Sequence, residues 1–188
     1  RAATYDRRVG MDPGVGETWP MRICFVCLGN ICRSPAAEAV AAHLLAGRDD
    51  LLDVELSSAG TGPWHVGALP HTHTRAEAAR RGIPVDHRGY QISPADFGRF
   101  DLLVAMDGGN VADLHEMAPD RSQAAKVVRL GAFAPGGDGA RWAGDDGRDV
   151  PDPFGDIQQA FARMFDQLEP ACAGLLDWVA SGSTKPPR

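Results

Sequence analysis

The chain has 188 residues, of which 44% are hydrophobic and 23% charged, a balance typical of a globular protein and unlike a wholly disordered one. No apolar run approaches the roughly 18 residues that a membrane span needs, and the first 20 residues lack the apolar segment of a secretory signal peptide. Nineteen basic against 25 acidic residues give a net charge of -6, so we expect neither a nucleic acid bound through bulk charge nor a membrane among its partners.

The N-terminal part predicts a leader, a strand, a loop and a helix. Residues 1–20 are rich in Gly, Pro and Arg without a period and are expected to form a flexible leader. Residues 22–27 are mostly apolar, which indicates a buried strand. A short turn over 28–33 follows, and Ser34 and Pro35 suit the N-cap and the first position of a helix.

Strands then alternate with helices. Further strands are expected at 54–58, 100–106 and 126–130. Helices are expected at 75–81 with Thr74 as the cap, from Ser93, at 110–117, and at 157–180 with Pro170 inside it. Loop and tail segments are expected at 132–150 and 182–188. This order predicts one α/β domain over 21–181, a three-layer α/β/α fold with a four-stranded parallel sheet and an anion-binding loop between its first strand and first helix.

Three of the four cysteines lie within nine residues, which favours reduced thiols in a cytoplasmic protein over a disulfide-stapled secreted one. Cys27 ends a predicted strand, and five residues separate it from Arg33 at the start of a helix. Inward-turned amides, the helix N-terminus and the guanidinium form a site for an anion such as phosphate. The same positive field favours a thiolate at Cys27, to which Ser34 is expected to donate a hydrogen bond.

These residues resemble the low-molecular-weight protein tyrosine phosphatases, and the resemblance runs from about 21 to 180. The matching positions are 26–35, 57–61, Trp64, 82–84, His87, Gln91, 106–107, 110–114 and 150–155.

The resemblance implies a phosphotyrosine phosphatase that needs neither a metal nor a cofactor. Cys27 would attack phosphorus and form a cysteinyl-phosphate, Arg33 would bind the phosphate, and Asp152 would act as general acid and then as general base. The phosphate-binding segment would comprise Leu28, Gly29, Asn30, Ile31, Cys32 and Arg33. Ser34, Ser58 and His87 would support this loop.

An apolar slot around the tyrosine ring is also implied, and its depth would favour phosphotyrosine over phosphoserine. Its walls would be Leu28, Ile31, Trp64 and Phe154, although Trp64 also fits an ordinary loop aromatic. The partners implied are phosphotyrosine proteins, a tyrosine kinase and its substrates, and the chain is expected to be a monomer or a weak dimer.

Other interpretations of single residues remain open. Cys24 and Cys27 fit a zinc or dithiol pair by spacing, although residues three apart on a strand face opposite ways. Cys32 is either a simple loop residue or, as the resemblance implies, a partner in a reversible disulfide with Cys27. His65, His71 and His73 suggest a metal cluster by composition alone, against which stand solvated loop histidines.

The whole chain has alternatives as well. An arsenate reductase of the same fold would need two further cysteines near the middle of the chain, and positions 33 to 171 contain none. A non-catalytic phosphate-binding module would not require a thiol together with an acid.

Cys24 and Cys172 are expected to pack in the core, and Asp149 to be solvated.

Overall fold

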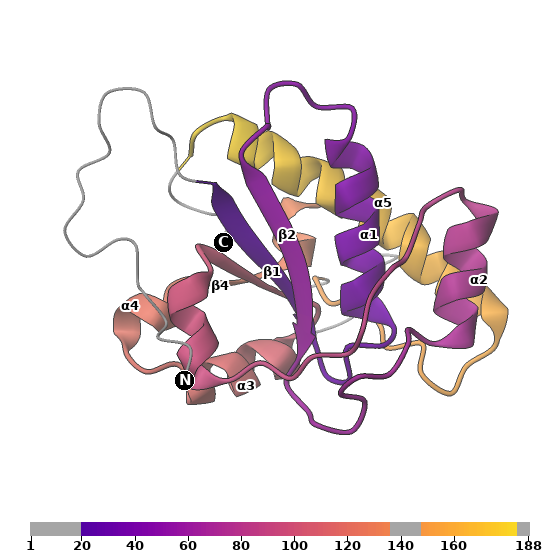
Figure 1. Cartoon of the computed structure of the whole chain (residues 1–188), viewed down its shortest axis with the longest axis horizontal. Coiled ribbons are helices and arrows are strands. Elements are labelled where there is room, and N and C mark those ends of the chain that lie inside the picture. The colour runs from indigo at the N-terminus through magenta and orange to yellow at the C-terminus, as the bar shows by residue number, and fades with distance from the viewer. Residues whose placement is uncertain (1–19, 136–147, 184–188) are drawn as a thin grey trace.

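The structure, a computed structural model, describes residues 20–135 and 148–183 (Figure 1). Almost all of the leader predicted at 1–20, most of the tail predicted at 182–188 and most of the loop predicted at 132–150 lie outside the described residues.

The described strands form one four-stranded, all-parallel sheet in the order β2-β1-β3-β4. β1 lies inside the sheet and pairs with β2 on one side and β3 on the other. Its residues from Ile23 to Cys27 are all buried, as a strand covered on both faces requires. The strands are β1 (Met21–Cys27), β2 (Val54–Gly60), β3 (Leu102–Ala105) and β4 (Val127–Arg129).

Helices cover both faces of this sheet, which confirms the predicted three-layer architecture. On one face Ile23 and Phe25 pack in a core with α1 and α5, and on the other Cys24 and Val26 pack with residues of α3 and a 3-10 helix (Figure 1). The helices are α1 (Arg33–Leu45), α2 (Thr72–Arg80), α3 (Gly108–Met117), α4 (Arg121–Ala124) and α5 (Gln158–Ala180), with 3-10 helices at Pro94–Arg99 and Leu130–Phe133.

Two helix starts differ from the prediction. The Thr74 cap is wrong: α2 begins at Thr72, His71 is its N-cap, and Thr74 is fully buried inside the helix. The Ser34 cap is also wrong, because α1 begins at Arg33, two residues before the predicted first position at Pro35, and the Ser34 hydroxyl contacts Cys27 instead. At α1 a tertiary contact replaces the local capping preference of Ser34, whereas at α2 another local cap, from the side chain of His71 to the amide of His73, takes the place of Thr74.

The long C-terminal helix has the apolar period that the sequence predicts. Phe161, Phe165, Leu168 and Leu175 are each 0% exposed and face the core, and α5 continues across Pro170. Cys24 and Cys172 are buried in the core, as expected. Within residues 20–135 and 148–183, no helix combines the length and the hydropathy that crossing a bilayer requires.

Gly174 is a point of close approach between α5 and the 3-10 helix at Leu130–Phe133. A methyl group at Gly174 would overlap the carbonyl oxygen of Phe133. We therefore expect Gly174→Ala to destabilise the fold by about 1–3 kcal/mol, because overpacking outweighs the better helix propensity of alanine.

Thermal unfolding followed by circular dichroism would test this, with Gly98→Ala as the matched control. An added methyl at Gly98 meets nothing within 4 Å. Equal melting temperatures for Gly174→Ala and Gly98→Ala would contradict the close approach.

Candidate active site

The segment between β1 and α1 curves around a hollow because its carbonyl groups are tied on the outside. The carbonyl oxygens of Cys27, Leu28 and Ile31 accept hydrogen bonds of 2.8–2.9 Å from the amides of Thr61, Gly62 and His71. With the carbonyls turned outward, the amides of the same segment turn inward, which is the geometry of an anion-binding nest. The amide of Asn30 lies 3.2 Å from the sulfur of Cys27 and donates to it.

Asn30 holds this curve in place. Its backbone is in the left-handed region with φ +52°, which asparagine tolerates better than most residues. Its buried side-chain amide donates to the hydroxyls of Ser34 (2.9 Å) and Ser58 (3.0 Å). Its side-chain oxygen accepts from the amide of Tyr90 (2.8 Å) and lies 2.7 Å from Nε2 of His87.

The side chains that Asn30 contacts are themselves joined through Glu38. Ser58 donates to Glu38 over 2.6 Å, and Nδ1 of His87 lies 3.3 Å from the same carboxylate oxygen. The structure therefore places Ser34, Ser58 and His87 behind the loop, as the family resemblance implied, and adds Glu38, which the sequence analysis did not name. Gly60 permits the close fit, since a methyl there would lie 2.8 Å from the carbonyl oxygen of Leu28.

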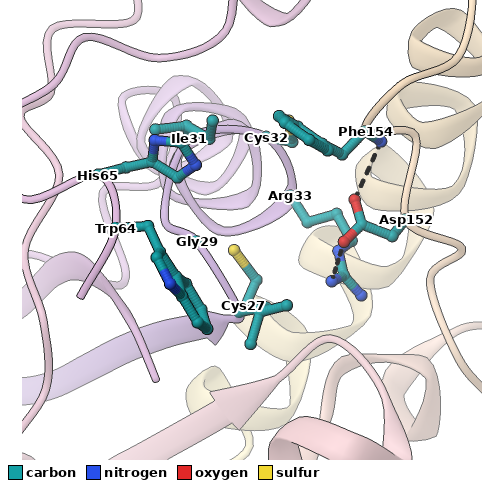
Figure 2. A pocket seen from close by; sticks show the side chains of 10 residues that line it. Cys27, Gly29, Ile31, Cys32, Arg33, Trp64, His65, Asp152 and Phe154 are labelled. Atoms are coloured by element: carbon teal, nitrogen blue, oxygen red, sulfur yellow. Dashed lines mark hydrogen bonds and ion pairs between the residues drawn. The ribbon is translucent and has the colours of Figure 1, made fainter. Parts of the chain in front are cut away.

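The sulfur of Cys27 lies at the bottom of a pocket of about 340 Å³. The Ser34 hydroxyl lies 3.0 Å from this sulfur and accepts from the side-chain amide of Asn30, and the carbonyl of Ala59 lies 3.2 Å away as a second acceptor for the hydroxyl proton. Figure 2 shows Trp64 and His65 on one side of this sulfur and Arg33 and Asp152 on the other. The lining residues are Cys27, Leu28, Gly29, Ile31, Cys32, Arg33, Trp64, His65, Asp152 and Phe154.

The guanidinium of Arg33 is nearly fully buried and is held by two carboxylates. Nη1 donates to Asp107 in a very short contact, and Nη2 donates to Asp152 over 2.6 Å. Burial alone would lower the pKa of Arg33, but the negative charges of Cys27, Asp152 and Asp107 together raise it above its usual value. In the described part of the chain its Nε is buried without a hydrogen-bond partner, and a bound oxyanion would satisfy this donor.

Asp152 reaches the pocket from the loop before α5. The amide of Val150 donates to the carbonyl of Met106 at the end of β3 (2.8 Å), and the Val150 carbonyl accepts from Arg33. One carboxylate oxygen of Asp152 accepts from Arg33, and the other accepts from the amide of Phe154 (3.1 Å). The loop is thus joined both to the residue that follows β3, an inner strand of the sheet, and to the buried guanidinium.

Sequence reasoning did not predict the contacts of two carboxylates next to this loop. Asp107 caps α3 through a 2.7 Å bond from the amide of Asn110 while also contacting Arg33. Asp149 accepts from the amide of Gly108 (3.0 Å) and from Arg129 (3.1 Å), so the expectation that it is solvated is wrong. The segment Asp107-Gly108-Gly109-Asn110 carries an N-cap signal, but only the fold brings it to Arg33.

The predicted slot residues line the pocket mouth with different exposures. Trp64 is 68% exposed, Phe154 59% and Leu28 42%, whereas Ile31 is 7% exposed. These apolar side chains line the same pocket as the sulfur of Cys27.

The three histidines of the neighbouring segment are half-buried rather than solvated. Their rings pack with two phenylalanines: His65 against Phe154, His71 against Phe154 and Phe161, and His73 against His71 and Phe161. Neither open interpretation of these histidines, solvated side chains or a metal cluster, describes this packing.

The other cysteines differ from Cys27 in their surroundings. Cys24 packs on the opposite face of the sheet from Cys27, so the zinc or dithiol pair loses its geometry. Burial raises the pKa of the Cys24 thiol to about 12. Cys32 lines the same pocket as Cys27, and burial together with the nearby charges of Asp152 and Cys27 raises its pKa to about 12. Cys32 is therefore a neutral thiol at neutral pH.

Comparison with known proteins identifies relatives over nearly the whole described chain. The family model described as low molecular weight phosphotyrosine protein phosphatase matches residues 22–184. A low molecular weight protein-tyrosine-phosphatase of Streptomyces coelicolor is 43% identical over 157 residues, which cover 82% of this chain and 91% of that protein. Low molecular weight protein-tyrosine phosphatase A of Mycobacterium bovis is 37% identical over 160 residues, 85% of this chain and 92% of that protein.

Solved structures give the same result for the fold. A crystal structure of a protein tyrosine phosphatase from Entamoeba histolytica, with Hepes in its active site, superposes with a TM-score of 0.78. It is 33% identical, and the match covers 86% of this chain and 98% of that one.

The bonds of Asn30 lead to a prediction about the anion site. Asn30→Gly keeps a residue that tolerates a positive φ but removes every side-chain hydrogen bond. We expect the affinity for inorganic phosphate to fall about ten-fold or more, because each lost bond is worth about 1 kcal/mol and leaves buried partners unsatisfied.

Protection of Cys27 from alkylation by iodoacetate, at increasing phosphate concentration, measures this affinity. Asn30→Ala is the companion variant and should also lower the melting temperature, since alanine disfavours the left-handed region by about 1–2 kcal/mol. Unchanged protection in Asn30→Gly would show that the side chain does not hold the loop.

Proposed function

Because the chain belongs to the low molecular weight phosphotyrosine protein phosphatase family, we propose that Cys27, Arg33 and Asp152 perform the reaction of this protein-tyrosine phosphatase. The observation that carries the proposal is their convergence on one pocket: Asp152 comes from far along the chain and lies 2.6 Å from Arg33, beside the sulfur of Cys27. The substrates are phosphotyrosine residues of proteins.

In the first step the sulfur of Cys27 attacks phosphorus and the bond from phosphorus to the phenolic oxygen breaks. Asp152 donates a proton to the departing oxygen, so that tyrosine leaves as a neutral phenol. The Ser34 hydroxyl and the Asn30 amide, 3.0 and 3.2 Å from the sulfur, support its anionic form before the attack. The product of this step is a cysteinyl-phosphate.

Arg33 and the inward amides of residues 28–33 bind the phosphate oxygens. In the structure Asp152 accepts a hydrogen bond from Arg33 on one oxygen and from a backbone amide on the other, an arrangement for an ionised carboxylate. A phosphate dianion competes with Asp152 for the guanidinium. Its negative charge also favours the protonated carboxyl that the first step requires.

In the second step a water molecule attacks the cysteinyl-phosphate. Asp152, now a carboxylate, takes a proton from this water, and the bond from phosphorus to sulfur breaks. Inorganic phosphate leaves and the thiolate of Cys27 is restored. The positive charge of Arg33 stabilises the transferring phosphoryl group in both steps, the role that a metal ion takes in other phosphatases.

The slot explains the preference for an aromatic phosphate. Trp64, Leu28 and Phe154 expose apolar surface in the pocket that holds the buried sulfur. A phosphotyrosine ring spans this depth and brings its phosphate to the loop, whereas the short side chain of phosphoserine does not.

The proposal also covers the bounds of the catalytic domain, the location of the enzyme and its oligomeric state. We propose residues 21–181 as the catalytic domain, in agreement with the matched range of 22–184. Free thiols at all four cysteines support a cytoplasmic location. A monomer or weak dimer that acts against a tyrosine kinase is the simplest arrangement for such a domain.

Hydrolysis of aryl phosphates without added metal tests the assignment of roles. We expect Cys27→Ser to abolish release of p-nitrophenol while the protein still binds phosphate, because the weaker nucleophile remains in an intact loop. We expect Asp152→Ala to lower kcat for phenyl phosphate by about 100- to 10,000-fold. The loss for p-nitrophenyl phosphate should be smaller, since its leaving group needs less help from a proton donor.

Two outcomes would contradict these roles. Turnover by Cys27→Ser at the wild-type rate would exclude the nucleophile, and equal losses on both substrates in Asp152→Ala would exclude the proton donor. Phosphate binding without any turnover by the wild type would support a phosphate-binding module instead.

We further propose that Cys27 and Cys32 form a reversible disulfide under oxidation. Peroxide converts the Cys27 thiolate to a sulfenic acid, and the Cys32 thiol attacks this sulfur with loss of water. Because Cys32 is itself a neutral thiol with a pKa of about 12, Cys27 is the one that peroxide oxidises first. Both thiols line the same pocket, which supports the pairing.

We predict that hydrogen peroxide inactivates the wild type reversibly and Cys32→Ala irreversibly. Without Cys32 the sulfenic acid proceeds to sulfinic acid, which thiol reagents do not reduce. Activity recovered by dithiothreitol after a peroxide pulse measures the difference, with Cys172→Ala as a control for loss of a buried thiol. Equal recovery of Cys32→Ala and wild type would refute the disulfide.

A further inference from the structure

His71 contacts both the phosphate-binding loop and α2, but it takes no direct part in the proposed reaction. Its backbone amide donates to the carbonyl of Ile31 in the phosphate-binding loop (2.8 Å), and it is the N-cap of α2. The same residue thus touches the loop of the nucleophile through its backbone and begins a helix through its side chain.

The ring of His71 lies between two phenylalanines. It stacks on Phe161 of α5, with ring centroids 5.0 Å apart and an interplanar angle of 10°. It also meets Phe154 edge-on, with centroids 6.0 Å apart at 70°. Phe161 is fully buried in the core, whereas Phe154 is 59% exposed. The His71 ring, which contacts both, therefore packs the exposed Phe154 side chain against a rigid part of the core.

Phe154 is joined in turn to the proton donor. Its backbone amide donates to a carboxylate oxygen of Asp152 over 3.1 Å, and only Pro153, which is buried, separates the two residues. A displacement of the Phe154 backbone would therefore be felt at the carboxylate of Asp152. His65 packs on Phe154 as well, at 6.1 Å, but it belongs to an exposed loop and offers less support.

The hydrogen bonds of His71 define its protonation. Nδ1 accepts from the amide of His73 over 3.3 Å, which requires an unprotonated Nδ1 and therefore a neutral ring. Burial, followed by the charge of His73, lowers the pKa of His71. Protonation would break the cap and place a cation at the positive end of α2.

The charged and titratable groups around His71 come from each neighbouring segment. His73 lies 5.3 Å away on α2, and Arg75 turns its Nε toward the carbonyl of Pro70. His65 lies beyond Phe154, and Asp152 precedes Phe154 in the same loop. From α5 come the neutral Phe161 and Gln158, which donates to the carbonyl of His73 over 3.2 Å.

We propose that the neutral ring of His71 is a positioning residue that holds Asp152 over the pocket through Phe154, and that protonation of this ring loosens the loop of Asp152. The inference rests on the proposed function, because it takes Asp152 as the proton donor. His71 does not touch the reacting atoms and acts only through Phe154.

The dependence of kcat on the leaving group separates positioning from a merely structural role. His71→Asn keeps a side-chain acceptor for the cap but removes the ring. We expect it to lower kcat for phenyl phosphate by about 10- to 100-fold, the size of effect that a small misplacement of a catalytic group produces. Its kcat for p-nitrophenyl phosphate should change by about two-fold or less, since that leaving group depends little on the acid.

His71→Phe provides the second arm, because it keeps the stacked ring and cannot be protonated. In the wild type the ratio of kcat for phenyl phosphate to kcat for p-nitrophenyl phosphate should fall as the pH drops from about 7 to 5, where an imidazole gains its proton. In His71→Phe the ratio should stay constant over this range. His43→Asn, at an exposed histidine in the last turn of α1, is the matched control and should behave as the wild type does.

Equal losses of kcat on both substrates in His71→Asn would overturn the inference. So would a wild-type kcat ratio that does not change with pH, or a kcat ratio in His71→Phe that falls as the pH drops. Asp152→Asn, measured in parallel, tests the proposed function by itself. If Asp152→Asn leaves the ratio unchanged, Asp152 is not the proton donor. If Asp152→Asn lowers the ratio and His71→Asn does not, only the role of His71 fails.

Discussion

The hydrogen bonds of Asn30 are the constraint on which the rest of the site depends. A loop that turns its amides toward an anion must turn its carbonyls away, and one residue must adopt a positive φ for the curve to close. Asn30 takes that conformation, and its side chain joins the loop to Ser34, to Ser58 of β2 and to the segment of Tyr90. The shape of the anion site is therefore fixed before any substrate enters.

The buried charge of Arg33 sets the electrostatic balance of the pocket. Two carboxylates and the sulfur of Cys27 surround a single guanidinium. Asp107 is bound to α3 by its capping bond and stays in place, whereas Asp152 sits on a loop with a side chain 40% exposed. A phosphate dianion is therefore expected to displace Asp152 more readily than Asp107, which leaves Asp152 free for its proposed proton transfer while Arg33 remains oriented.

The sequence was sufficient for the parts of the site that are local. The spacing of Cys27 and Arg33 around a turn predicts the anion loop directly, and alternating strands and helices predict the layers. Asp152, Ser58 and His87 were reached only through the family resemblance, because their contacts depend on the sheet order. Asp107, Glu38 and His71 were missed since each combines an ordinary local feature, such as an N-cap, with a contact that only the fold creates.

The loop of Asp152 has no helix or strand of its own between Val150 and α5, so its position depends on points of attachment. The amide of Val150 fixes one end to β3, and Arg33 holds the carboxylate itself. Binding of substrate must open the second attachment, because the phosphate takes the guanidinium. What then holds Asp152, the proposed proton donor, is the attachment on the far side, where the ring of Phe154 packs against His71 and the ring of His71 stacks on Phe161. On the proposed role of His71, this remote contact matters most once the substrate is bound.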